Sequence, residues 1–354
     1  MRLLHLCPAQ FGATGVVGGA ERYATELAKA TAAFAEVRLA VFGPRAERRE
    51  LARGCELRVL HNLPGLSRDN PLGPGLLREL LWAGVIHCHQ HYTLLTSAAA
   101  LGGRLLGRKV FSSDLGGGGR SLAAWTDISR WMRGVLTISE FSTGQLDDLS
   151  APKRVVYAGV DTGRFRPGGE KEPGLVLFVG RLLPHKGVNY LIEGLPPGAK
   201  LKVVGRPYSP EFFAELRRLA EGKDVEFLTD ADDELLPELY RRAQVFVLPS
   251  VPRLADGRDA SKAELFGLVL VEAMASGTAV IGSNAFSIPE IIRDGVNGLL
   301  VPPNDSQALG AAVAQLLDSP ATARAMGLAG RAIAEERFTW KAVAERCLAA
   351  YREM

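Results

Sequence analysis

The sequence predicts an α/β protein made of two domains, each built around a parallel β-sheet. Short apolar runs alternate with longer amphipathic stretches along the chain, which is typical of strands alternating with helices in βαβ units. A stretch rich in glycine, proline and charge, GVDTGRFRPGGEKEPG at residues 159–174, interrupts the alternation and indicates a linker, after which the pattern restarts. The length of 354 residues fits two domains of ordinary size.

The first domain is expected to cover residues 1–165. Its strands are the apolar runs at residues 3–7, 37–42, 57–60, 85–89, 109–113 and 135–139, and its clearest helices are residues 20–34 and 94–106. The second domain is expected to cover residues 166–336, with strands at 175–179, 201–204, 225–228, 245–248 and 279–281 and helices at 210–220, 234–242 and 268–276. A helix in the segment 337–354 ends the chain. Two parallel sheets facing each other would form a cleft, which the strand-to-helix loops would line, because ligands bind beyond the carboxyl ends of such strands.

Composition excludes several classes of protein. Charged residues make up 23% and apolar residues 47% of the chain, and the net charge of +3 does not indicate a nucleic-acid-binding protein. The four cysteines form no CxxC pair, so neither a disulfide framework nor a zinc site is expected. Because no stretch approaches the ~20 apolar residues that span a bilayer, we expect a cytoplasmic protein, with any membrane contact made peripherally at the inner surface.

The loop after the first strand, PAQFGATGVVGGAER, is rich in glycine and leads into a helix. Its later glycines, Gly18 and Gly19, would let backbone N–H groups approach an anion at the helix N-terminus, although a simple flexible turn explains the same pattern. The spacing is not that of a dinucleotide fingerprint. The second strand ends in VFGPR without the acidic residue that would hold a ribose, so a nicotinamide cofactor is disfavoured.

The second domain opens with LVLFVGRLLPHKG, in which Gly180 and Arg181 end a strand and Lys186 precedes a helix. Two cations at a strand-to-helix turn suit a diphosphate, with arginine binding as a planar fork and lysine as a point charge. The alternative interpretation is a pair of solvated surface cations.

The segment KAELFGLVLVEAMASG places two carboxylates, Glu264 and Glu272, eight residues apart. If the whole segment is helical, they lie about 12 Å apart along the axis, at about 1.5 Å per residue. Such carboxylates could hold hydroxyls at the two ends of a sugar–diphosphate–ribose. The backbone N–H groups between them would face the phosphates, those of Phe266, Gly267, Leu268 and Val269.

The combined motifs resemble those of the family 4 glycosyltransferases. The resemblance rests on GR-x4-KG (Gly180, Arg181, Lys186, Gly187), then E-x7-E (Glu264, Glu272), then NGLLVPPND and a closing helix that contains FTW. It spans essentially the whole chain and is strongest over residues 175–305. It implies a GT-B fold with two Rossmann-like domains, the donor held mainly by the C-terminal one, and a final helix crossing back to the N-terminal one.

The resemblance also implies residue roles. Glu272 would hold the nucleotide ribose, and Glu264 would contact the hydroxyls or the reacting face of the donor sugar. Arg181 and Lys186 would neutralise the diphosphate leaving group, while Gly18 and Gly19 would approach it from the first domain. The implied reaction moves a hexosyl unit from a nucleoside-diphosphate sugar to an acceptor hydroxyl with retention of configuration, and it needs no metal or other cofactor.

Two features of the first domain depart from this pattern or add to it. Many members of the family carry a histidine where this chain has Ser113 and Asp114, so we expect Asp114 to contact the donor or acceptor, unless it only starts the glycine turn that follows. His87, His89 and His91 alternate at the end of a strand, which would put all three on one face. We expect His89 to lie on the acceptor side, and a metal site is disfavoured.

Three weaker features have competing interpretations. The acidic residues Asp230, Asp232 and Asp233 precede a helix and favour capping over metal binding. Phe286 stands where relatives carry a Gly-Gly pair and would narrow the pocket or merely pack. Arginine-rich stretches in the first domain would form solvated helix faces or a basic face for anionic lipid; they contain Arg45, Arg48, Arg49, Arg53, Arg104, Arg108 and Lys109.

Two other functions remain open from the sequence. The missing histidine permits a non-catalytic partner subunit that keeps the fold and binds a nucleotide sugar, although its intact donor motifs argue against this. A nicotinamide oxidoreductase is the weaker alternative. The sequence leaves the donor sugar, its base and the acceptor open, whether the acceptor is a glycan, lipid-linked or a small molecule.

Overall fold

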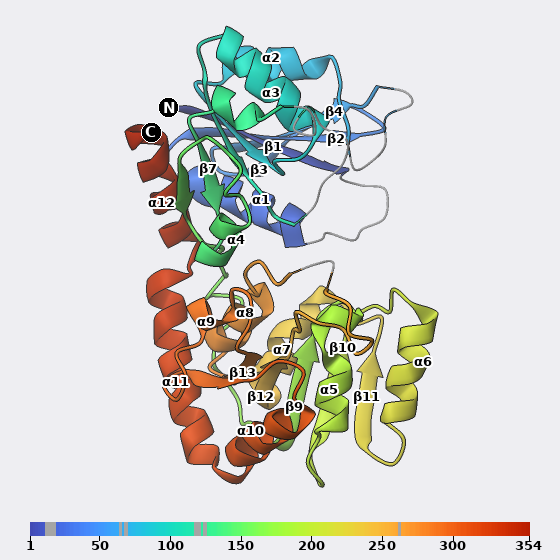
Figure 1. Ribbon diagram of the computed structural model, residues 1–354. Helices are drawn as coiled ribbons and strands as arrows, with labels where there is room; N and C mark the ends of the chain where they lie inside the picture. The colour runs from blue at the N-terminus through green and yellow to red at the C-terminus, as the bar shows by residue number, and fades with distance from the viewer. Residues whose placement is uncertain (11–18, 64–65, 67–69, 117–121, 123–125, 261–262) are drawn as a thin grey trace. The chain divides into compact units, whose positions relative to one another are not determined.

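The computed structural model describes residues 1–354 except 11–18, 64–65, 67–69, 117–121, 123–125 and 261–262. The chain divides into two compact units (Figure 1). The first comprises residues Met1–Gly159 and Trp340–Met354, and the second comprises Val160–Thr339. The boundary lies at residue 159 rather than at the expected 165. Residues 160–165 belong to the second unit because Val160 pairs with Thr339 and Phe165 packs edge-on against Tyr240.

The sheet of the first unit has eight strands in the order β3-β4-β2-β1-β5-β6-β7-β8. All neighbours pair in parallel except β3 and β4, which form an antiparallel edge hairpin. The strands are β1 Arg2–Gln10, β2 Glu36–Gly43, β3 Glu47–Ala52, β4 Cys55–His61, β5 Val85–His89, β6 Lys109–Ser113, β7 Gly134–Thr137 and β8 Lys153–Val155. The helices are α1 Gly19–Thr31, α2 Gly75–Trp82, α3 Leu94–Leu105, α4 Glu140–Gly144 and α12 Trp340–Glu353.

Alternation along the central strands gives this sheet two different faces. One face carries Leu4, Leu6 and Ile86 and packs against the apolar residues of α2 and α3 in a continuous core. The other face carries His5, His87 and Phe111, which contact residues of α1 and α12. Helix α12 therefore packs within the first unit, although the second unit precedes it in the chain.

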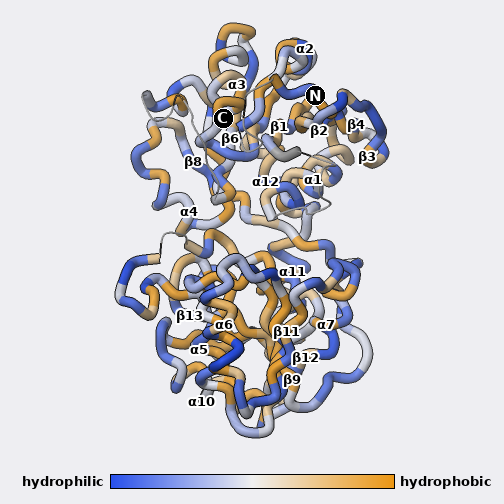
Figure 2. Tube along the Cα trace, turned by 90° about the vertical axis from the view of Figure 1, so that its right-hand side faces the viewer, coloured by the Kyte–Doolittle hydropathy of each residue, from blue (hydrophilic) through white to orange (hydrophobic). Residues whose placement is uncertain are grey.

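The sheet of the second unit has six strands, all parallel, in the order β11-β10-β9-β12-β13-β14. Strands β9 and β12 are hydrophobic along their inner length, as Figure 2 shows. Their residues there are buried, as a sheet covered by helices on both sides requires. The strands are β9 Glu172–Val179, β10 Lys200–Val204, β11 Asp224–Leu228, β12 Ala243–Leu248, β13 Ala279–Ser283 and β14 Gly298–Val301. The helices are α5 Val188–Glu193, α6 Pro210–Leu219, α7 Leu236–Arg242, α8 Leu268–Ala275, α9 Ile288–Ile291, α10 Ser306–Asp318 and α11 Pro320–Arg337.

The expected α/β architecture with two parallel sheets is confirmed, and three strands were missed. Strands β3, β8 and β14 lie at sheet edges; β3 and β8 have no buried side chain and a weak apolar signal, and β14 is only four residues long. The arginine-rich stretch at residues 47–52 forms edge strand β3, not a solvated helix face.

Candidate functional site

Three loops meet at the carboxyl edge of the second sheet. They follow β9, β12 and β13, which are neighbours in the sheet and run in the same direction. Lys186 comes from a short 3-10 turn after β9, Ser250 and Glu264 come from the long segment after β12, and Ser287 follows β13. The topology thus gathers polar side chains from distant parts of the sequence at the edge where parallel sheets bind ligands.

Lys186 and Glu264 form the central ion pair of this edge. The Lys186 Nζ lies 2.5 Å from Glu264 Oε2, and both side chains are 13% exposed. The Ser250 hydroxyl donates to the same carboxylate oxygen at 3.4 Å, and the Ser287 hydroxyl donates to the Glu264 carbonyl at 2.8 Å. The carboxylate is therefore held from two loops, and the ammonium group is fixed at a half-buried position where its charge is poorly screened by water.

Gly187 makes this position of Lys186 possible. It has φ +68°, and a Cβ there would lie 1.9 Å from the Pro249 carbonyl oxygen, so only glycine fits between the β9 and β12 loops. Gly205 plays a similar part beside Gly180, because a Cβ on Gly205 would lie 1.8 Å from the Gly180 carbonyl oxygen. The glycines of this edge allow close backbone approach.

Helix α8 begins at Leu268, not at Glu264. Gly267 adopts φ +87° and stops the helix from extending backward, and no side chain caps the first turn. The helix expected at residues 268–276 is thus confirmed, whereas its conditional extension back to Glu264, with the two carboxylates about 12 Å apart on one helix, is wrong. The first-turn N–H groups of α8, which include those of Leu268 and Val269, are a helix N-terminus without a side-chain cap, as suits an anion. The Phe266 side chain is buried against Phe338 and anchors the loop before it.

Glu272 lies inside α8 with only 6% of its surface exposed. The Tyr240 hydroxyl donates to Glu272 Oε2 at 2.9 Å, and Tyr240 is itself fully buried. A buried carboxylate needs hydrogen-bond donors, and Tyr240 supplies one of them to Glu272. Tyr240, Ser250 and Ser287 were all missed from the sequence; Ser250, two residues past the end of an apolar run, is the one whose position could have signalled it.

Arg181 is exposed beside the same edge. Its guanidinium carbon lies 5.9 Å from the centre of the Tyr208 ring. In the part of the chain that the structure describes, no carboxylate forms an ion pair with it. Arg181 therefore offers a cation that an anionic ligand can approach from solvent.

The first unit contains the remaining predicted site residues. Gly18 lies outside the described residues, and Gly19 is the exposed first residue of α1. Asp114 follows β6, and its Oδ1 accepts the Gly116 N–H at 3.3 Å, which is the turn-forming role considered as its alternative. Burial raises the pKa of Asp114 to about 6, against the effect of the Gly116 and Leu115 N–H groups.

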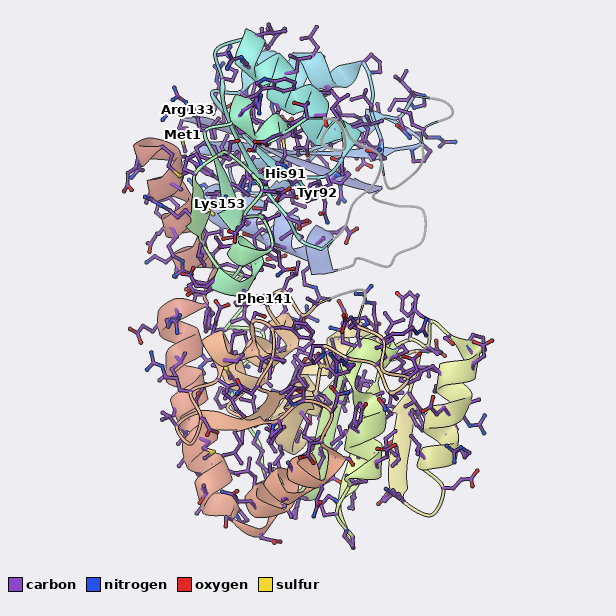
Figure 3. The ribbon with its side chains drawn as sticks, viewed as in Figure 1. Met1, His91, Tyr92, Arg133, Phe141 and Lys153 are labelled. Carbon is purple, nitrogen blue, oxygen red and sulfur yellow. The ribbon has the colours of Figure 1, made fainter. Side chains whose placement is uncertain are left out.

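The three alternating histidines do not share one face. His87 and His89 join His5 from β1 in a fully buried cluster, but Gln90 has φ 138° and breaks the alternation before His91. His91 bonds Ser112 on the opposite face of the sheet, and it and Tyr92 follow directly after β5 (Figure 3). Burial lowers the pKa of His91 to about 4 and raises the pKa of Tyr92 to about 12.

The buried histidine cluster is a hydrogen-bonded network within the core. His5 Nδ1 lies 2.8 Å from His89 Nε2, and His87 contacts the hydroxyls of Tyr351 at 2.7 Å and Ser113 at 2.8 Å. Burial lowers the pKa of His5 to about 3 and holds those of His87 and His89 well below their usual range. The prediction that His89 lies on the acceptor side is wrong, because its side chain is 1% exposed and packs under Tyr23.

Local geometry decides the role of the acidic cluster and places Phe286. The Asp232 carboxylate accepts the Glu234 N–H and caps a 3-10 turn, which confirms capping for the acidic cluster. Phe286 is half-buried and adopts φ +58°, a left-handed conformation that favours glycine, directly before Ser287.

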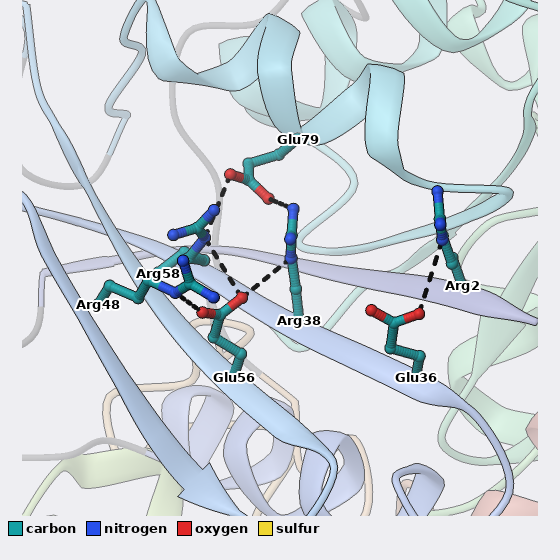
Figure 4. Close-up of polar contacts among 7 residues, drawn as sticks. All are labelled: Arg2, Glu36, Arg38, Arg48, Glu56, Arg58 and Glu79. Carbon is teal, nitrogen blue, oxygen red and sulfur yellow. Dashed lines mark hydrogen bonds and ion pairs between the residues drawn. The ribbon is translucent and has the colours of Figure 1, made fainter.

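The arginines of β3 are largely neutralised by neighbouring acids. Figure 4 shows Arg48 and Arg38 on Glu56, with Glu79 bridging Arg38 at 3.1 Å and Arg58 at 3.4 Å. Arg49 pairs with Glu47 at 3.0 Å. A basic face over this hairpin is therefore not present.

Comparisons with known proteins agree with the fold. The family described as "Glycosyl transferases group 1" matches residues 160–333, and the one described as "Glycosyltransferase Family 4" matches residues 17–164. Anabaena HepE, solved in complex with UDP and glucose, superposes with a TM-score of 0.74 at 20% identity, with 100% of both chains covered. The chain thus has the GT-B fold. None of the helices that the structure describes has the length and apolar character needed to cross a bilayer.

Curated relatives extend the match in sequence. Alpha-maltose-1-phosphate synthase of Mycolicibacterium smegmatis is 31% identical over 327 residues, which covers 77% of this chain and 79% of the relative. D-inositol 3-phosphate glycosyltransferase of Segniliparus rotundus is 36% identical over 219 residues, or 56% of this chain. That match spans 46%, about half, of the relative's length.

Proposed function

Since this chain belongs to the family 4 glycosyltransferases, we propose that it transfers a hexosyl unit from a nucleoside-diphosphate sugar to an acceptor hydroxyl with retention of configuration. The observation that carries the proposal is the Lys186–Glu264 pair at the carboxyl edge of the second sheet, with α8 beginning uncapped in the same segment. This arrangement combines a fixed cation, a fixed carboxylate and a helix N-terminus, which suit the diphosphate and hydroxyl groups of such a donor.

The diphosphate of the donor is proposed to lie at the first turn of α8, between Lys186 and Arg181. Lysine has three N–H donors, so Lys186 can keep its contact with Glu264 while another N–H bonds a phosphate oxygen. As the glycosidic bond breaks, negative charge develops on the leaving diphosphate. Preorganised cations and backbone dipoles stabilise that charge most in a partly dehydrated site.

Glu264 is proposed to contact the hydroxyls or the reacting face of the donor sugar. Ser250 and Ser287 hold its loop, so the carboxylate is already oriented before a ligand arrives. Glu272 is proposed to accept the ribose hydroxyls, with Tyr240 fixing the orientation of its carboxylate. Gly18, Gly19 and Asp114 of the first unit are proposed to complete the donor or acceptor contacts.

Because lysine, arginine and a helix N-terminus supply the positive charge, the proposed reaction needs no divalent metal. We expect turnover to persist in the presence of EDTA. Several relatives carry phosphorylated molecules in their names, such as D-inositol 3-phosphate and maltose 1-phosphate. Phosphorylated polyols and sugars are therefore the acceptors to try first.

The test is a screen of nucleotide sugars against these acceptors, with the product examined by proton NMR. The proposal expects one donor to yield a product whose anomeric configuration matches that of the donor sugar, with release of the nucleoside diphosphate. A product of inverted configuration would overturn the retaining assignment. A donor that binds without turnover over the full acceptor panel would favour the non-catalytic alternative.

A further inference from the structure

The outward faces of α2 and α3 carry large apolar side chains in contact with solvent. On α2, Leu77 is 58% and Leu81 is 51% exposed, and on α3, Leu101 is 42% and Leu105 is 78% exposed. Each pair has the spacing i, i+4, so each forms a stripe along its helix. Side chains of this size are costly to hydrate, and contiguous patches of them mark interaction surfaces.

The two stripes belong to one surface because the helices pack against each other. A Cβ on Gly102 of α3 would lie 2.9 Å from Leu80 Cδ1 of α2, so the absence of a side chain lets the helices approach closely. The Arg108 guanidinium, just after α3, donates to the Leu81 carbonyl at 3.0 Å. Figure 1 shows α2 and α3 side by side on the same face of the first sheet. We call this surface, with its four leucines, the α2–α3 face.

The charges on the α2–α3 face are all positive. Arg78 and Arg104 are exposed among the leucines, and Arg108 is half-buried at the edge. The sole acid in the sequences of the two helices is Glu79, which is 2% exposed and engaged below the surface by Arg38 and Arg58 (Figure 4). Helix α6 of the second unit, by contrast, mixes both signs, with Glu211, Glu215, Arg217 and Arg218.

We propose that the α2–α3 face docks on an anionic lipid surface. Leucines that project from interfacial helices insert at the boundary between headgroups and acyl chains, while arginines beside them bind anionic headgroups. Charge complementarity favours an anionic lipid surface over a second copy of the chain, because a second copy would bring arginine against arginine. Of the two arginine-rich stretches that the sequence offered for lipid binding, the one around β3 is excluded by its own ion pairs, and Arg104 and Arg108 of the other belong to the α2–α3 face. This inference does not depend on the proposed transfer reaction.

The test is co-sedimentation of the purified full chain with vesicles of phosphatidylcholine alone or of phosphatidylcholine with phosphatidylglycerol. We expect binding to the anionic vesicles only, weakened by salt because headgroup attraction is screened. The double variant L77S/L105S should bind about tenfold or more weakly, as expected from the apolar surface it removes. The double variant R78Q/R104Q should also bind the anionic vesicles about tenfold more weakly, and mainly at low salt.

Matched controls come from the second unit. L328S removes a leucine of α11 that is 55% exposed, and R217Q/R218Q removes two adjacent arginines of α6. Both controls should bind vesicles as the wild type does. All the substituted side chains are exposed, so melting temperatures should stay unchanged and report on folding.

Three results would overturn the proposal. The first is a wild-type chain that binds neither vesicle type, and the second is a loss in the α2 and α3 variants no greater than in the controls. The third is a dimer in sedimentation velocity that L77S/L105S dissociates, because it would assign the face to a second copy. Transfer to a soluble acceptor is measured in parallel and should not change, which separates this proposal from the proposed function.

Discussion

The histidine cluster of the first unit is fully buried and the Lys186–Glu264 pair of the second unit is half-buried, and the fold uses these two polar groups differently. His5, His87 and His89 point from the strands into the layer of α1 and α12, and they bond to one another and to hydroxyls of that layer. Lys186 and Glu264 stand on loops beyond the strands, in a segment where a helix begins without a side-chain cap. The direction of a polar side chain relative to the sheet edge, more than its chemistry, thus distinguishes a side chain packed in the core from one placed where a ligand could reach it.

Substitution of either member of the Lys186–Glu264 ion pair has the largest expected effect on turnover. K186A and E264Q should each lower turnover by about 10²- to 10³-fold, as loss of one preorganised group that stabilises developing charge does. The matched control is K202A, which removes another lysine of the same unit from its 2.8 Å contact with Glu226. Turnover is measured with saturating acceptor, and circular dichroism checks folding. Near-wild-type turnover in both K186A and E264Q would contradict the assignment of this ion pair to the reaction site.

The histidine cluster should affect stability and leave catalysis unchanged. H87A leaves a small cavity and removes one hydrogen-bond partner from each of the buried hydroxyls of Tyr351 and Ser113, which costs about 2–4 kcal/mol of unfolding free energy. Urea denaturation measures this loss. The turnover number per folded molecule should match that of the wild type. If H87A instead lost turnover at unchanged stability, the cluster would take part in the reaction.

The same cluster predicts how stability depends on pH. The pKa of His5 is lowered from 6.5 to about 3 in the folded chain, so below pH 6.5 the unfolded chain binds more protons. The free energy of unfolding therefore has its full value at neutral pH, and it decreases as the pH falls from about 6.5 toward 3. At pH 5 the unfavourable contribution of His5 alone is about 2 kcal/mol. The urea midpoints of the wild type and H5Q, each measured at neutral pH and at pH 5, test this contribution. An equal pH dependence of the midpoint in both proteins would contradict the assignment to His5.

The smallest effect is expected at Asp114, whose role in turns competes with a role at the site. If its carboxylate contacts the donor or acceptor, turnover should rise with pH through about 6, where this group loses its proton. The variant D114N should remove that rise and lower turnover less than tenfold. An identical pH–rate profile in the wild type and D114N would assign Asp114 only its role in forming the turn with Gly116.

The buried strands could be predicted from the sequence, and the contacts between distant loops could not. The extents of β5 and β6 match their apolar runs because strands covered on both faces leave a continuous signal. Strand β3, ERRELA, carries no such signal because its side chains are mostly exposed. The helix that holds Glu272 was predicted from residue 268, where α8 begins, but its conditional extension back to Glu264 fails because Gly267 adopts a left-handed conformation that helical periodicity does not report.

The site was predictable by residue type and only partly by geometry. The chemistry of Lys186 and Glu264 was evident from their motifs, but their direct contact joins positions 78 residues apart and depends on the order of β9, β12 and β13 in the sheet. The position of His89 was mispredicted because alternation along a strand does not say which face a helix will cover.

Calorimetric titration of UDP, GDP and ADP into the wild type, K186A and K202A tests the central claim most directly, that the carboxyl edge of the second sheet holds the donor diphosphate. We expect one nucleotide to bind the wild type and K202A with equal affinity and to bind K186A at least about tenfold more weakly, a loss of about 1.4 kcal/mol. Equal affinity of that nucleotide for K186A and the wild type would contradict the claim.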